Sequence, residues 1–215
     1  MKPLNKYIDH TLLKAEAGEE DVIKLCSEAK EHEFYAVCVN SCYVELAKKQ
    51  LAGSDVKIAA VVGFPLGACL SGVKACEAAA ATALGAAEID MVINVGALKE
   101  RRYDYVLEDI KGVAEAAGKD GAIVKVILET CLLSDEEVIK ACELSKDAGA
   151  AFVKTSTGFS TAGATARHVK LMKDTVGDAM WVKASGGIRD KAKAMEMIEA
   201  GADRIGASAS VEICK

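Results

Sequence analysis

The chain has 215 residues, of which 51% are hydrophobic and 27% are charged, and its formal net charge is −5 at pH 7. This length and apolar content fit one domain with a sizeable core, predicted over residues 1–215, and they exclude global disorder. The modest negative charge argues against nucleic acid or an anionic membrane surface as the main partner.

The N-terminal segment has no signal-peptide core, and the longest apolar run, Glu77 to Ile89, is mostly alanine and too short to span a bilayer. We therefore expect a cytoplasmic protein whose eight cysteines are reduced thiols, most of them packed as small buried hydrophobic residues. No cysteine or histidine stands at zinc-ligand spacing, so no metal is expected.

Short β-branched runs alternate with longer amphipathic segments along the whole chain. The predicted elements, in chain order, are strand 7–10, helix 18–31, strand 35–40, helix 41–51, strand 57–64, helix 71–84, strand 88–94, helix 102–117, strand 122–129, helix 135–147, strand 151–156, helix 164–176, strand 180–185, helix 190–200, strand 204–207 and a short helical segment 208–214. Gly85, Gly149 and Gly201 stand where helices should end, because glycine adopts the left-handed conformation without strain.

Eight strand–helix units predict an α/β protein built as a single closed (β/α)8 barrel, and about 27 residues per unit would make a compact example of the fold. The alternative is an open, doubly wound sheet. Such a sheet normally carries a glycine-rich fingerprint after its first strand, and the sequence has no such motif.

Four ionisable residues interrupt strands that should be continuous apolar runs: Asp90, Lys125, Lys154 and Lys183. Their strand neighbours are apolar, so side-chain alternation places the neighbours under the helices and the ionisable groups inside the barrel. The three lysines are spaced 29 residues apart, which predicts equivalent places in consecutive units. Burying several charges is costly, so the set predicts a functional site.

A lysine attacks a carbonyl only when it is unprotonated, whereas an ordinary lysine has a pKa near ~10.4. A neighbouring cation and partial burial both lower the pKa of such an amine. Lys154 and Lys183, one unit apart, therefore predict a Schiff-base pair, with Asp90 and Asp9 balancing the charge. Glycine- and hydroxyl-rich turns follow the last three strands, where barrels commonly bind phosphate.

Segments along nearly the whole chain resemble the deoxyribose-phosphate aldolase family of class I aldolases. The matching segments are 7–14 (YIDHTLLK), 36–40 (AVCVN), 62–67 (VGFPLG), 88–94 (EIDMVIN), 125–130 (KVILET), 152–158 (FVKTSTG), 182–189 (VKASGGIR) and 204–208 (RIGAS). The pieces that contain Lys154 and Lys183 are highly specific in combination.

The resemblance implies reversible cleavage of 2-deoxy-D-ribose 5-phosphate to acetaldehyde and D-glyceraldehyde 3-phosphate, without metal or organic cofactor. It implies that Lys154 forms the Schiff base and that Lys183 is the cation that keeps this amine unprotonated. Asp90 matches the acid/base aspartate, which moves protons through an ordered water. Asp9 and Lys125 match supporting polar positions around it.

Further positions match the rest of the family's pocket. Cys38 matches a cysteine that lines the acetaldehyde side, and the phosphate-binding loops match Gly158, Gly186, Gly187, Gly206 and Ser208. Ala209 departs from the pattern where some members have a second serine. The implied partners are small phosphosugar and aldehyde substrates, and dimers are common for such barrels.

Fold alone does not fix function, so another Schiff-base phosphosugar aldolase on the same barrel is the alternative. Among the remaining residues, His32 and His168 are expected to face solvent. His10 could either reach the pocket or cap a turn, and Trp181 is expected to fill the barrel.

Overall fold

The computed structural model describes residues 2–215 and closes eight parallel strands into a barrel, with each strand beside the next. The ring closes where β1 pairs with β8, from Ile8 opposite Ile205 to His10 opposite Ala207. This closure confirms the (β/α)8 prediction and excludes the open sheet. The strands are β1 (Ile8–Leu12), β2 (Ala36–Asn40), β3 (Lys57–Val62), β4 (Glu88–Val92), β5 (Ile123–Ile127), β6 (Phe152–Lys154), β7 (Trp181–Ser185) and β8 (Arg204–Ala207).

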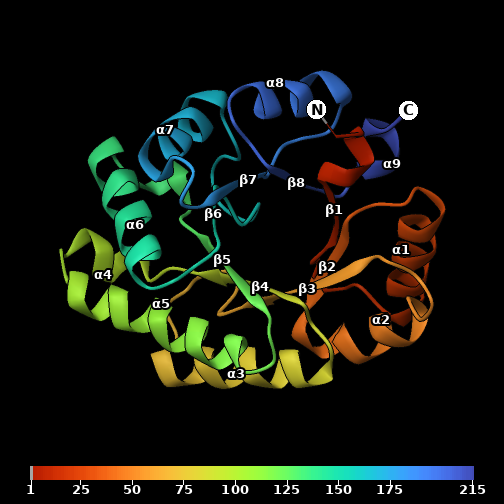
Figure 1. Ribbon diagram of the computed structural model, residues 1–215, viewed down its shortest axis with the longest axis horizontal. Helices are drawn as coiled ribbons and strands as arrows, with labels where there is room; N and C mark the ends of the chain where they lie inside the picture. Colours follow the sequence, from red (N-terminus) through yellow and green to blue (C-terminus); the bar gives the residue numbers. More distant parts are fainter. Residues whose placement is uncertain (1) are drawn as a thin grey trace.

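Helices surround the barrel, and the two chain ends lie near each other beside α9 (Figure 1). The helices are α1 (Glu19–Glu31), α2 (Val44–Gln50), α3 (Ser71–Leu84), α4 (Val95–Lys99), α5 (Tyr103–Gly118), α6 (Asp135–Asp147), α7 (Ala166–Val176), α8 (Lys191–Glu199) and α9 (Ser210–Ile213). Short 3-10 turns occupy Leu4–Tyr7, Ser41–Tyr43 and Thr130–Leu132.

The local signals for helix ends are confirmed. Gly85, Gly149 and Gly201 have φ angles of 118°, 81° and 112°, which only glycine adopts readily. The short helix α4 was not predicted, because its residues extend the apolar run of the preceding strand. The Asn94 side chain accepts a hydrogen bond from the amide of Ala97 at 3.0 Å, so this residue caps α4 instead of continuing β4.

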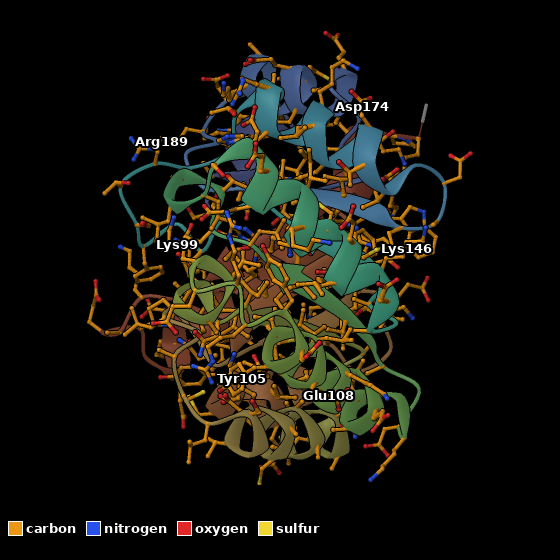
Figure 2. All side chains as sticks on the ribbon, turned by 90° about the vertical axis from the view of Figure 1, so that its left-hand side faces the viewer. Lys99, Tyr105, Glu108, Lys146, Asp174 and Arg189 are labelled. Carbon is orange, nitrogen blue, oxygen red and sulfur yellow. The ribbon has the colours of Figure 1, made fainter. Side chains whose placement is uncertain are left out.

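Strand side chains divide into two sets according to parity. The outward set, which includes Val37, Ile89 and Val153, packs with the helices in the main hydrophobic core. Inside the barrel a second, smaller apolar cluster contains Leu13, Cys38, Ala59 and Val61, with Phe64 against it. Figure 2 shows ordinary surface charges on the outer helices, among them Glu108, Lys146 and Asp174. Buried charged side chains also lie inside the barrel, among them Asp90 and Lys125.

Candidate active site

The strand alternation predicted from the sequence brings five ionisable side chains together inside the barrel. Asp9, Asp90, Lys125 and Lys183 are 0% exposed and Lys154 is 2% exposed. Asp90 pairs in register with Lys125, and Lys154 pairs with Lys183. The equivalence of all three lysines is only partly right, because the register partner of Lys125 on β6 is Phe152, two residues before Lys154.

Asp90 connects the three lysines. Lys125 Nζ donates to Asp90 Oδ1 at 2.6 Å, and the amines of Lys154 and Lys183 each donate to Oδ2 at 2.8 Å. Lys183 also donates to Asp9 Oδ2. The carboxylate of Asp90 therefore lies within hydrogen-bonding distance of every amine in the set.

These contacts fix the charges of several groups. Burial alone would raise the pKa of Asp90, but the ammonium groups around it outweigh burial and hold that pKa well below its usual range. Burial alone would lower the pKa of Lys183, but Asp9 and Asp90 outweigh burial and raise it. Lys183 therefore stays protonated beside Asp9 and Asp90.

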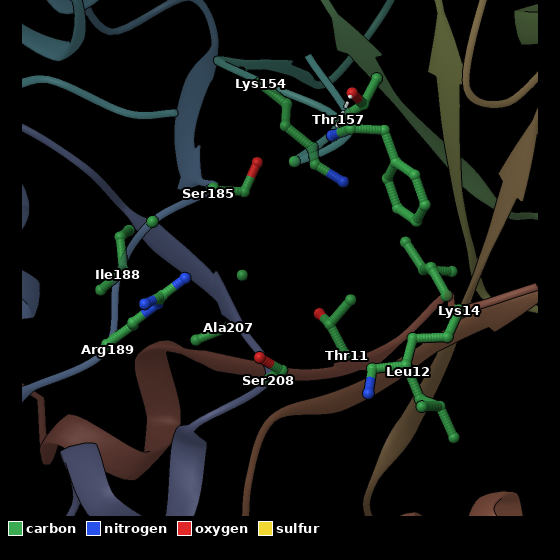
Figure 3. A pocket seen from close by; sticks show the side chains of 16 residues that line it. Thr11, Leu12, Lys14, Lys154, Thr157, Ser185, Ile188, Arg189, Ala207 and Ser208 are labelled. Atoms are coloured by element: carbon green, nitrogen blue, oxygen red, sulfur yellow. Dashed lines mark hydrogen bonds between the residues drawn. The ribbon is translucent and has the colours of Figure 1, made fainter. Parts of the chain in front are cut away.

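A cavity of about 250 Å³ opens above this cluster at the carboxyl ends of the strands. Of the three lysines inside the barrel, Lys154 lines the cavity, whereas Lys125 and Lys183 are not among its lining residues in the described part of the chain. Figure 3 shows Lys154 on one side of the cavity and Ser208 on the other, with the Arg189 side chain directed into it. Contact with the cavity therefore distinguishes Lys154 from the two other lysines.

The five residues predicted for phosphate loops all line this cavity: Gly158, Gly186, Gly187, Gly206 and Ser208. Gly186 has a φ of +88°, and a Cβ there would lie 3.0 Å from the Cα of Gly163, so two backbone segments touch at this point. Gly206 has a different role in the packing, because a Cβ at this position would lie 3.1 Å from Lys183 Cε.

Cys38 lies deeper than the resemblance implied. Its side chain is 0% exposed, belongs to the apolar cluster inside the barrel, and is not among the described residues that line the cavity. Its Sγ lies 3.9 Å from Asp90 Oδ2. Burial and the Asp90 charge raise the pKa of the thiol, so it is held in its neutral form.

Two charged residues of the cluster were not assigned from the sequence. Glu88 Oε2 forms an ion pair with Lys125 Nζ at 2.5 Å, and Arg204 Nη1 donates to Asp9 Oδ1 at 2.9 Å and to Glu88 Oε2 at 3.2 Å. The sequence did contain a signal for Glu88. It precedes Asp90 by two residues, so side-chain alternation places both on the inner face of the strand.

The turn after β6 is held by another unassigned residue, Glu129. Its buried carboxylate accepts from the Thr157 hydroxyl and, at 3.2 Å, from the Thr157 amide. The Thr157 oxygen in turn accepts from the amide of Phe159 at 3.0 Å. Both Thr157 and Phe159 line the cavity, so this network shapes its wall. The cationic side chains of Lys14 and Arg189 also line it and were not assigned.

The structure places all three histidines away from the cavity. His10 does not reach the cavity: its Nε2 lies 2.8 Å from Glu28 Oε2 and its Nδ1 lies 3.0 Å from Ser210 Oγ, on the outer side of β1. His32 and His168 are half-buried and not simply solvent-facing, and the ring of His32 stacks on Phe34.

The predictions for Trp181 and for most cysteines are wrong. Trp181 is 53% exposed because it begins its strand, at the amino-terminal mouth of the barrel, and has no layer of side chains below it. Its ring lies 5.2 Å from that of Phe152.

Of the eight cysteines, three are buried: Cys26, Cys38 and Cys142. No disulfide joins any of the eight.

No helix within residues 2–215 has both the length and the apolar character needed to cross a membrane. The same residues contain no group of three or more histidine, cysteine, aspartate or glutamate side chains placed to hold a metal ion.

Comparison with known proteins identifies the family of the chain. The sequence profile of the DeoC/LacD family aldolases matches residues 4–215. The chain is 63% identical over 210 residues to the deoxyribose-phosphate aldolase of Clostridium novyi, covering 98% of this chain and 94% of the relative. It is 61% identical over 211 residues to that of Clostridium tetani, covering 98% and 97%.

Solved structures of similar proteins have the same fold. An aldolase called QR15 superimposes with a TM-score of 0.94 at 43% identity, covering 100% of this chain and 95% of the other. A tetrameric deoxyribose phosphate aldolase from Aeropyrum pernix superimposes with a TM-score of 0.90 at 37% identity, covering 98% and 89%.

Proposed function

Because the chain belongs to the DeoC/LacD family of aldolases, we propose that it reversibly cleaves 2-deoxy-D-ribose 5-phosphate to acetaldehyde and D-glyceraldehyde 3-phosphate. The observation that carries the proposal is the position of Lys154: its amine lines the cavity and lies 2.8 Å from a carboxylate that two buried lysines also contact. An amine in this position is suited to form a Schiff base.

The reaction begins when the unprotonated amine of Lys154 attacks C1 of the open-chain aldehyde. Loss of water from the carbinolamine gives an iminium, which draws electrons from the C2–C3 bond. Removal of the proton from the C3 hydroxyl then breaks this bond and releases D-glyceraldehyde 3-phosphate. The remaining enamine is protonated at C2, and hydrolysis of the resulting iminium releases acetaldehyde and restores the amine.

Asp90 is the proposed proton relay for these steps. Because the buried ammonium groups of Lys125 and Lys183 lower its pKa, a proton taken up by Asp90 is quickly passed on, either to an amine or to water. Lys183, Lys125 and Asp9 hold this carboxylate in place and supply donors around it. Asp90 thus transfers protons without storing them.

The phosphate would bind at the glycine-rich turns after β6, β7 and β8. Gly158, Gly186 and Gly187 offer backbone amides at the cavity, and the Arg189 side chain points into it (Figure 3). The phosphate is remote from the bond that breaks, so its binding energy positions the aldehyde at Lys154. Cys38, beneath the cavity, belongs to the apolar side that the two-carbon fragment would meet.

Trapping the Schiff base tests this proposal directly. Acetaldehyde and borohydride should leave an ethyl group on Lys154, because hydride reduces the C=N bond to a stable secondary amine. Peptide mass spectrometry should find the adduct in the native chain and in Lys146→Ala, a surface control, but not in Lys154→Ala. An adduct that persists in Lys154→Ala would refute the assignment.

A second measurement separates the two candidate reactions. A coupled assay that detects D-glyceraldehyde 3-phosphate should respond when 2-deoxy-D-ribose 5-phosphate is added. An adduct at Lys154 without this product would instead indicate another Schiff-base phosphosugar aldolase on the same barrel. We also propose that the chain acts in the cytoplasm and needs no metal or organic cofactor. We further propose that it forms a homodimer, and light scattering of the purified protein would test this oligomeric state.

A further inference from the structure

Arg204 lies at the floor of the barrel, at the opposite end from the substrate cavity. It begins β8, is 4% exposed, and its guanidinium carbon lies 3.5 Å from the centroid of the Tyr35 ring. Its Nη1 donates to Asp9 Oδ1 at 2.9 Å and to Glu88 Oε2 at 3.2 Å. Neither the cavity nor Lys154 contacts this side chain, so it is separate from the substrate site.

The two carboxylates that Arg204 holds are also the ones that hold lysines of the active site. Asp9 accepts a hydrogen bond from Lys183 through its other oxygen, and Glu88 forms an ion pair with Lys125 Nζ at 2.5 Å. Both of these lysines donate to Asp90, which contacts Lys154. A continuous set of ion pairs therefore runs from the floor of the barrel to the proposed nucleophile.

The charges in this set balance only when Arg204 is counted. Asp9, Glu88 and Asp90 supply three carboxylates, whereas Lys125, Lys183 and Arg204 supply three cations. The carboxylates raise the pKa of the Arg204 guanidinium, so it stays charged. An unprotonated Lys154 then leaves no net charge in the low-dielectric interior, where an uncompensated charge is costly.

Outside the set, the cations of Lys14 and Arg189 line the cavity beside Lys154, but both are exposed and solvent screens their charges. The neutral thiol of Cys38, on β2, contacts Asp90, and the Tyr35 ring packs under Arg204. On β3, the side chains of Ala59 and Val61 belong to the same inner apolar cluster as Cys38 and carry no charge. Lys2 and Asp203 lie at the outer rim of the floor, where Lys2 Nζ donates to the Asp203 carbonyl.

We propose that Arg204 is a positioning residue of the active site: it orients Asp9 and Glu88 from below and supplies the third buried cation that leaves Lys154 free to react. The proposal rests on the Schiff-base function proposed above. If Arg204 were removed, three carboxylates would face two cations, and a proton on Lys154 would restore the balance.

The test is the pH dependence of adduct formation between acetaldehyde and Lys154. In Arg204→Met we expect the acid side of the rate profile to move to higher pH by about one unit, because one buried cation is lost from the connected set. In Glu88→Gln, which removes one negative charge, we expect a move to lower pH. The double variant should return close to the native profile, and Arg204→Lys should lie near the native enzyme.

A merely structural role predicts a different pattern. If Arg204→Met lowers the rate by the same factor at every pH, or if Glu88→Gln does not compensate it, the proposal is wrong. If Arg204→Met does not fold, Glu88→Gln alone decides, and an unmoved profile overturns the proposal. The native enzyme separates this result from the function itself, because absence of any adduct on native Lys154 would refute the Schiff-base function whatever Arg204 does.

Discussion

The barrel interior and the layer between barrel and helices both contain buried charges, but the charges are organised differently. In the outer layer Lys74 and Asp109 form an isolated pair at 2.5 Å, both fully buried, between α3 and α5. In the interior, Asp90 alone contacts three amines. An isolated pair has each charge cancelled by one partner, whereas a connected set lets a proton move among several groups. The comparison suggests that the outer pair stabilises the fold and the inner set performs the chemistry.

The largest expected effect comes from breaking the inner set at its centre. Asp90→Asn keeps the shape of the side chain but removes the charge and the ability to carry a proton. We expect kcat/KM for 2-deoxy-D-ribose 5-phosphate to fall by about a thousandfold, within the range of a lost acid/base group. The coupled assay for D-glyceraldehyde 3-phosphate measures this loss, and Asp174→Asn on the surface of α7 is the matched control. A loss of less than tenfold would remove Asp90 from its proposed role.

Breaking the outer pair should affect stability and leave the chemistry intact. In Lys74→Met, Asp109 remains buried without its partner, and Lys74 no longer donates to the Val92 carbonyl. We expect the free energy of unfolding to fall by about 3–5 kcal/mol, measured by urea unfolding. Replacing both partners by apolar residues should recover much of the loss. At temperatures where the variant is folded, kcat should stay unchanged, and a large fall in kcat there would contradict the comparison.

The difference between the two regions also explains what the sequence could predict. Asp90, Lys125, Lys154 and Lys183 are visible because a charge is unusual in a buried parallel strand, and alternation then gives its direction. Lys74 gives no such signal, because charged residues are ordinary on the solvent face of a helix. The pairing between α3 and α5 depends on tertiary packing, which helix periodicity does not describe.

Depth along the barrel axis was the other quantity that the sequence did not determine. Parity assigns a residue to the inner face but does not give its height, so the offset of Lys125 and the exposed position of Trp181 were missed. Height depends on how neighbouring strands are staggered when the barrel closes. For the same reason Cys38 was expected at the cavity wall and lies beneath it.

The apolar side of the interior offers a smaller test. The Cys38 thiol is neutral and packs with Ala59 and Val61, so the comparison assigns it no charge or proton transfer. We expect Cys38→Ala to lower kcat/KM by less than tenfold and the free energy of unfolding by about 1 kcal/mol, from lost packing. The same assay and urea titration measure both quantities. A loss as large as that of Asp90→Asn would place the thiol in the chemistry.

The smallest expected effect is a change in how stability depends on pH. His10 lies in the outer layer, where burial lowers its pKa despite the hydrogen bond with Glu28. The unfolded chain therefore takes up a proton near pH ~6.5 more readily than the folded chain, and stability falls as the pH drops below that value. Asp9 and Asp90 behave differently, because their lowered pKa values keep their contribution intact until the pH falls below ~3.9.

Between pH 7 and 5 the outer layer should thus lose stability before the inner set does. In His10→Gln, which keeps hydrogen-bonding capacity but does not titrate, the free energy of unfolding should decline less steeply over this interval than in the native chain. Urea unfolding at pH 7, 6 and 5 measures both slopes. Parallel slopes would show that a group other than His10 causes the decline. The contrast between an outer layer that titrates in this interval and an interior whose charges stay constant would then fail.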